Sequence, residues 1–267
     1  MVHKPSNRYG VNMGFRGFEH WDRMRLKTNV LSSVICQVRF SHNFEIEEPS
    51  SVAGFQKGLK LRYPDAMPRQ ELLLELSVQG AQSSEMRTPS IYRFRDTSGA
   101  WVVSLSPDWI GLETTEYTNF EDFRKRLDEA LGLVEDQFAP AQTNRIGFRY
   151  VNELPCVGKG AWRELVQPEL HGLAADDNVL DHLVDAVEEL HLALGPNKMN
   201  VRHGVAANGE HSCYVFDIDA FSEARGEFST DAILATVDEL KSQAWSFFRA
   251  SMTDELMSRL GTAEHGS

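Results

Sequence analysis

The sequence predicts an α+β protein whose antiparallel sheet is continuous and curved, with its helices on one face. Three observations predict this class. Runs of alternating apolar and β-branched residues outnumber helical stripes and follow one another along the chain, which favours antiparallel pairing. Long amphipathic stripes occupy residues 119–138 and 231–251. Similar short motifs recur about 110 residues apart, which indicates a tandem duplication of a strand–helix–strands–helix unit.

The first predicted unit covers residues 30–140 and opens with a strand. Residues 30–40 alternate and are rich in β-branched side chains, and residues 50–63 carry a helical stripe that ends at a proline. The long helix that closes the unit has Thr118 or Asn119 as its N-cap. The elements expected between these helices are a turn at residues 96–99 and strands at residues 72–78, 91–95, 101–105 and 110–115.

The second predicted unit covers residues 141–261. Residues 180–194 fit either a helix or a strand, and the duplication favours the strand. The other expected elements are a strand at residues 145–152, a helix at residues 160–173, a hairpin turn at residues 195–197, and a final helix at residues 231–251 that breaks near Thr253 and restarts before Gly261.

The duplication depends on an offset that stays nearly constant. At an offset of 110 residues, Arg39 falls over Arg149 within an apolar–Arg–aromatic pattern. One inserted residue then aligns residues 102–105 with residues 213–216. Two such units can join edge to edge into one saddle-like domain, which hides one sheet edge of each. The order of elements resembles the saddle of TATA-binding proteins in topology, and a shared fold does not carry a function with it.

Three sequence runs carry a resemblance to a known family. They are VRHGV at residues 201–205, YVFDID at 214–219 and SFFRASMTDEL at 246–256. Together with residues 34–40 and 145–152, they resemble an uncharacterised, sporadically distributed bacterial family of similar length, over about residues 28–260. The patchy occurrence of that family implies an accessory module of the defence, mobile-element or toxin–antitoxin type. It implies no catalytic residues for this chain.

The composition is typical of a globular protein, with 267 residues of which 42% are hydrophobic and 25% charged. There is no run of about 18 apolar residues, so we expect no membrane span. Three cysteines are too few for a disulfide framework or a zinc site. The first residues lack the apolar segment of a secretory signal, so a cytoplasmic location is expected.

The charge is unevenly distributed. The formal net charge is −12, yet residues 1–29 hold six lysines and arginines against two acidic residues. This basic N-terminal arm is either a partly ordered tail or an aid in gripping a partner. The acidic remainder disfavours duplex nucleic acid, because binding to phosphates needs clustered Lys and Arg.

Four polar residues on the predicted first strands are candidates for binding a ligand or a partner. They are Arg39, Arg145, Arg149 and Asn152. Strand alternation turns Arg39 and Arg149 away from the helices, where they suit an anionic ligand, a partner protein or a second copy of the chain. The alternative is that these arginines form intramolecular ion pairs with some of the many carboxylates.

A metal site is the alternative candidate. Asp217 and Asp219 are two residues apart on a predicted strand and share one face, so with His203 they could hold a divalent cation in a metal-dependent hydrolase or nuclease. The simpler interpretation is a solvated strand end. The nearby histidines, His182, His191 and His211, have no metal-ligand spacing.

No nucleotide-binding, nucleophile-elbow or zinc-protease motif is present, so no cofactor is expected. The sequence therefore favours a non-enzymatic binding protein, which grips a partner protein or an anionic ligand on the face of the sheet that the helices leave open. The metal-dependent enzyme remains the second hypothesis.

Overall fold

The computed structural model describes Trp21 and residues 26–67, 91–156, 158, 160–208 and 211–261. Ten strands of these residues form one open antiparallel sheet, in the order β2-β3-β4-β5-β1-β6-β9-β8-β7, with β10 paired beside β6. The predicted α+β class with its antiparallel sheet is confirmed. The strands are β1 (Leu31–Phe40), β2 (Asp65–Met67), β3 (Tyr92–Arg95), β4 (Trp101–Ser106), β5 (Trp109–Thr114), β6 (Gln142–Cys156), β7 (Ala186–Leu194), β8 (Asn197–Asn208), β9 (His211–Ser222) and β10 (Gly226–Glu227).

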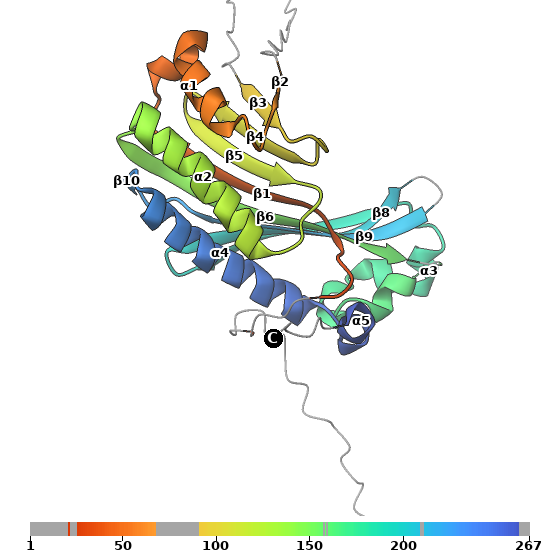
Figure 1. Cartoon of the computed structure of the whole chain (residues 1–267). Helices are drawn as coiled ribbons and strands as arrows, with labels where there is room; N and C mark the ends of the chain where they lie inside the picture. Colours follow the sequence, from red (N-terminus) through yellow and green to blue (C-terminus); the bar gives the residue numbers. More distant parts are fainter. Residues whose placement is uncertain are drawn as a thin grey trace, which may run out of the picture.

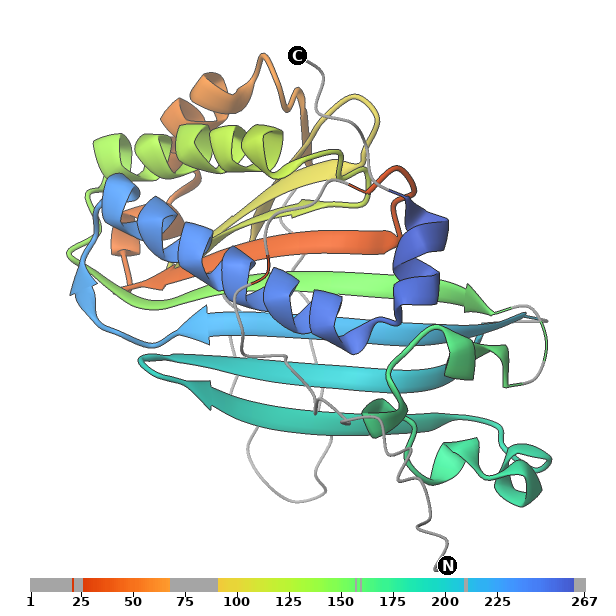
Figure 2. The ribbon, with the colours of Figure 1, turned by 90° about the horizontal axis from the view of Figure 1, so that it is seen from below.

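Five α-helices occur in the described residues, and the two long ones lie side by side on one face of the twisted sheet (Figure 1). Figure 2, turned by 90° and seen from below, shows these two helices, α2 and α4, lying over the strands. The α-helices are α1 (Pro49–Leu59), α2 (Phe120–Phe138), α3 (Asp177–Leu180), α4 (Thr230–Ser251) and α5 (Asp254–Leu260). Short 3₁₀ helices are η1 (Phe44–Glu47), η2 (Ala161–Glu164), η3 (Pro168–Leu170) and η4 (Leu173–Ala175).

Local sequence signals set the ends of these helices. The Asn119 side chain accepts a hydrogen bond from the Asp122 N–H and so caps the start of α2. At the end of α4 the chain leaves the helical conformation, and the Thr253 side chain then caps α5 by accepting from the Leu256 N–H. The predicted break and restart near Thr253 are thus confirmed.

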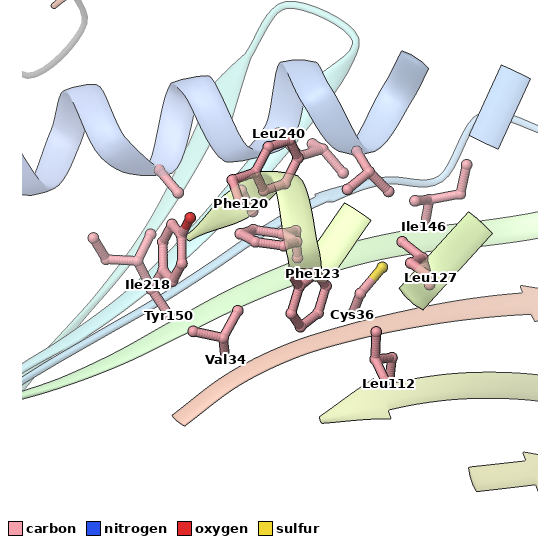
Figure 3. Packing of buried hydrophobic residues seen from close by; sticks show 14 of the residues in the cluster. Val34, Cys36, Leu112, Phe120, Phe123, Leu127, Ile146, Tyr150, Ile218 and Leu240 are labelled. Atoms are coloured by element: carbon pink, nitrogen blue, oxygen red, sulfur yellow. The ribbon is translucent and has the colours of Figure 1, made fainter. Parts of the chain in front are cut away.

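The core lies between the sheet and the helices. Strand β1 alternates along its length, and Val34, Cys36 and Val38 are buried on the helix side. Figure 3 shows Val34 and Cys36 of β1 with Leu112, Ile146, Tyr150 and Ile218 of other strands, facing Phe120, Phe123, Leu127 and Leu240 of the long helices. These apolar contacts continue from one half of the sheet to the other, so the described residues share one core.

The centre of the sheet is the pairing of β1 with β6, the first strands of the two predicted units. Gln37 lies opposite Gly147, and these two residues are 110 positions apart, which is the predicted offset. A local two-fold axis through this pair relates Arg39 to Arg149. The register of the central strands therefore agrees with the predicted equivalence.

Farther from the centre, the predicted strand correspondences do not match positions in the sheet. The offset of 111 aligns residues 102–105 of β4 with residues 213–216 of β9. However, β9 is the direct neighbour of β6, whereas β5 separates β4 from β1. The strand order alone does not establish a duplication, and the two repeat units at residues 30–140 and 141–261 stay a prediction.

One predicted helix is wrong. The sequence predicts a helix over residues 160–173, and the chain there forms the short η2 and η3 instead. Pro168 cannot continue the hydrogen-bond pattern of a preceding helix, and Gly172 has a positive φ of 54°. The segment over residues 180–194 is a strand only from Ala186 onward, as β7, and it ends at the predicted hairpin turn.

The predicted strand at residues 72–78 and most of the basic arm lie outside the described residues. Phe123, Leu127, Val134, Leu234 and Val237 are buried as their helical stripes predict, and Trp245 is partly buried against the core. Among the described helices, none combines the length and the apolar character that crossing a bilayer requires.

Candidate binding face

The face of the sheet opposite the helices, called here the open face, carries alternate residues of the central strands. On β1 these include Gln37 and the exposed Arg39, and on β6 they include Arg145 and Arg149. Asp217 and Asp219 of β9 share this face, because Asp219 lies opposite Arg149 in the strand register. Strand alternation alone thus places three candidate arginines and both candidate aspartates on one surface.

Two ion pairs cross from β6 to β9. Arg149 binds Asp217 through two hydrogen bonds, Nε to Oδ1 at 2.7 Å and Nη2 to Oδ2 at 2.5 Å. The Arg145 Nη2 donates to the Asp219 Oδ2 at 2.8 Å. The alternative prediction, that the arginines form intramolecular ion pairs, is therefore correct for Arg145 and Arg149.

The ion pairs and their burial change the acidity of these groups. The hydrogen bonds from Arg149 to Asp217 stabilise the charged guanidinium and raise the pKa of Arg149. Burial raises the pKa of the Asp219 carboxyl, because the loss of solvation outweighs the attraction to Arg145 and Arg149. The open face thus combines a pair at Asp217 held by two hydrogen bonds with a carboxyl at Asp219 whose pKa is raised by burial.

Two glycines allow large side chains to lie flat on the open face. The Arg145 guanidinium covers Gly147, where an added Cβ would lie 2.5 Å from Nη1, and its Cζ is 4.5 Å from the centroid of the Phe221 ring. In the same way the Trp109 ring covers Gly111, where an added Cβ would lie 3.2 Å from the indole. The two glycines lie on either side of Gln37 in the strand register, so Trp109 and Arg145 cover neighbouring positions of the open face.

Arg39 lies between these two flattened side chains. In the strand register it is opposite Trp109 of β5 on one side and Arg145 of β6 on the other. Its Nε makes a long hydrogen bond of 3.4 Å to the Gln37 Oε1. Among the residues that the structure describes, Arg39 has no ion-pair partner, so it presents an uncompensated cation on the open face, near the end of the middle strand β1.

Asn152 does not join this surface. It is buried on the helix side of β6, and its side-chain amide donates to the carbonyl oxygen of Phe216 at 2.9 Å. It differs from Arg149 by an odd number of positions, so alternation turns it to the other face. The candidate set therefore divides into an exposed cation, two ion-paired arginines and a buried structural amide.

The candidate metal ligands are also divided between the two faces. His203 is buried on the helix side of β8, where its Nδ1 is 2.8 Å from the Tyr214 hydroxyl, while Asp217 and Asp219 lie on the open face. A sheet separates the imidazole from the carboxylates, so these three residues cannot bind one ion. Over the described ranges, no group of three or more His, Cys, Asp and Glu side chains converges on a metal position.

The remaining candidates for chemistry are dispersed. His191 lies on the open face of β7, far in register from the buried His203. Burial raises the pKa of the Cys36 thiol to about 12, which keeps it protonated and unreactive at neutral pH. Cys36 is therefore not a candidate nucleophile.

Trp109 is the functional candidate that sequence reasoning missed. A signal was present, because Trp109 directly precedes the strand predicted at residues 110–115 and lies two positions before Gly111, just as Arg145 lies two positions before Gly147. A large side chain two residues before a glycine on the same strand face is free to fold over it. The partners of Arg145 and Arg149 carried no such local signal, because they lie on β9, about 70 residues away.

Comparison with protein-family models found no family that matches this chain, and comparison with curated proteins found no relative. The class that the fold defines is an open antiparallel α+β sheet with helices on one face.

Proposed function

We propose that this protein is a non-enzymatic binding protein, which holds an acidic segment of a partner protein against the open face of its sheet. The observation that carries the proposal is the exposed guanidinium of Arg39 beside Trp109, near the end of the middle strand of that face. Arg and Trp are the residue types most enriched among side chains that dominate binding energies. A guanidinium also binds a carboxylate through two parallel hydrogen bonds.

The neighbouring arginines are already paired within the chain. Arg145 and Arg149 bind Asp219 and Asp217, so a ligand carboxylate would compete there with an internal one. Arg39 has no such competitor among the described residues, which favours binding of a ligand carboxylate at Arg39.

The charge of the whole chain favours a protein partner over duplex nucleic acid. With a formal net charge of −12, the molecule repels a polyanion at long range. A single acidic side chain or a short acidic segment experiences the local field of Arg39 at contact, where that repulsion is a small part of the binding energy. Membership of a bacterial accessory module accords with such a binding role.

The test compares capture of host-cell proteins by the full chain and by two charge-reversal variants. Arg39→Glu places a carboxylate beside Trp109 on the open face. Lys125→Glu makes the same change of charge at an exposed position of α2, on the helix side of the molecule. We expect that the wild type and Lys125→Glu capture a protein that Arg39→Glu does not. The affinity of Arg39→Glu for that protein should be lower by about tenfold or more.

The captured protein is then purified and titrated at several salt concentrations. An affinity that falls with salt agrees with recognition by Arg39. If all three baits retain the same proteins with equal affinity, the open face is not the binding site. If Arg39 is instead required for binding a small anionic metabolite, the proposed site is correct and the proposed class of partner is wrong.

A further inference from the structure

Strand β7 forms one edge of the sheet. It pairs with β8 along its full length, from Ala186 opposite Val205 to Leu194 opposite Asn197, and it ends the strand order. Within the described part of the chain, no strand pairs with its outer side. A nine-residue edge strand with free N–H and C=O groups is a template for pairing with another strand.

Two large apolar side chains are exposed at the start of the same strand. Val184 is 77% exposed and lies two residues before β7, and Val187 within β7 is 44% exposed. Exposed apolar side chains beside an unpaired strand edge favour contact with another protein chain.

We propose that β7 pairs antiparallel with β7 of a second copy of this chain, with Leu190 opposite Leu190 at the two-fold axis. This register places Glu189 of each copy opposite His191 of the other, on the open face. The exposed fractions of these two side chains are 60% and 68%, so both are available. The imidazole of His191 already approaches Glu189 within one chain, at 3.6 Å.

The polar side chains of β7 favour this register among the symmetric ones. A pairing centred on Glu189 sets two carboxylates face to face, and like charges directly opposite each other destabilise a strand pair. A pairing centred on His191 sets two imidazoles face to face, whereas the pairing centred on Leu190 sets each imidazole opposite a carboxylate that can accept a hydrogen bond from its N–H. A slip by one residue also moves Leu190 relative to its partner, and Leu190 packs against the core on the helix side.

The other edge of the sheet is less suited to this role. Strand β2 has only three residues, Asp65–Met67, and the Asp65 carboxylate there binds Arg95 of β3 at 3.1 Å. A short, charged edge resists pairing with another strand. Pairing through β7 joins the two sheets into one and brings two open faces onto the same surface, so a partner with two acidic segments would bind with increased avidity.

The test measures the mass of the full chain in solution by light scattering after size-exclusion chromatography. We expect a dimer for the wild type. His191→Glu sets two carboxylates opposite each other twice, and Glu189→Lys removes the carboxylate that accepts from His191 in both places. Each variant should therefore raise the dissociation constant of the dimer about tenfold. The double variant restores complementary pairs and should return the dimer affinity to within about threefold of the wild type. Asp128→Lys, at an exposed position of α2, is the matched control and should leave the dimer unchanged.

A second measurement tests the register independently. Leu190→Cys places two thiols opposite each other across the axis, within reach of a disulfide, and should give a cross-linked dimer on mild oxidation. Ala193→Cys faces Val187 of the partner copy and should not. A wild type that stays monomeric at about 0.1 mM overturns the proposal, because the dimer would then bind more weakly than a specific interface does. A dimer that neither charge variant weakens also overturns it, and so does equal cross-linking at both positions. The measurement needs no partner protein, so its outcome is independent of the binding proposed for Arg39.

Discussion

Arg39 and Arg149 occupy equivalent positions about the local axis, and their surroundings give them different roles. The carboxylate of Asp217 is only 12% exposed and accepts two hydrogen bonds from Arg149, so this pair is stronger than an exposed ion pair worth about 0–1 kcal/mol. Arg39 faces Trp109 and Arg145 instead. Arg149 therefore links β6 to β9, whereas Arg39 is free to bind a ligand.

His203 is a buried titratable residue of the helix side. Its ring stacks with Tyr214, at 6.1 Å between centroids, and its Nδ1 shares a hydrogen bond with the Tyr214 hydroxyl. Its Nε2 has no hydrogen-bond partner among the described residues, and the nearest carboxylate oxygen, of Glu188, is 3.7 Å away. Burial lowers the pKa of His203 below its ordinary value of 6.5, because the charged ring loses solvation.

We predict that this histidine makes the protein less stable in mild acid. Below pH 6.5 the unfolded chain binds a proton at this position that the folded chain does not bind, so the free energy of unfolding decreases as the pH falls. In His203→Phe that contribution is absent, and the decrease between about pH 6.5 and 5 should be smaller. Urea unfolding at several pH values measures both slopes, and parallel slopes would contradict the prediction.

At the scale of elements, α2 illustrates how packing stabilises a helix. Asn119 caps its start, and the side chains of Phe123, Leu127 and Val134 are buried on one side of it. Phe123 packs edge-on against Phe148 of β6, with 5.6 Å between the ring centroids. The helix therefore depends on the sheet beneath it more than on its own propensity.

We predict that Leu127→Ala destabilises the protein by about 2–5 kcal/mol, because it removes buried apolar atoms and leaves a cavity. Leu127 is 1% exposed, and the neighbouring Asp128 is exposed. Asp128→Ala on the same helix is therefore the control, and its effect should stay within about 0.5 kcal/mol. Denaturant midpoints measure the difference, and equal midpoints would place Leu127 outside the core.

At the scale of the molecule, one sheet and one core join the two halves of the chain. Strands β1 and β6 pair along their length at the centre, and α2 of the first half lies beside α4 of the second, where Arg124 binds Asp238 at 3.1 Å. Neither half closes its own core without the other. The repeat units, whether or not they arose by duplication, are expected to act as one folding unit.

We predict a single cooperative unfolding transition for the full chain. Trp162 reports on the second half, and Trp101 and Trp109 report on the first. Tryptophan fluorescence and far-ultraviolet circular dichroism should therefore give coincident midpoints in denaturant. Two separated transitions, or fluorescence changes that precede the loss of helix, would show that the halves unfold independently.

Much of the secondary structure could be predicted from the sequence, because its causes are local. The alternation of residues 31–40 indicates a strand with one buried face, and Asn119 with the apolar stripe behind it indicates α2. Residues 160–173 misled the prediction, since their apolar spacing suits a helix while Pro168 and Gly172 interrupt it. Parity along β6 could also have separated Asn152 from the arginines.

By itself, the sequence determined the α+β class, the two long helices and the face on which Arg39 and Arg149 lie, because periodicity and capping act within a few residues. Only the tertiary structure decided what these arginines do. Strand order brings β9 beside β6, so that Asp217 and Asp219 neutralise Arg149 and Arg145, while β5 brings Trp109 beside Arg39. It also leaves β7 at an edge. Such contacts depend on which strands become neighbours, which is settled by the packing of the whole chain and not by any local pattern.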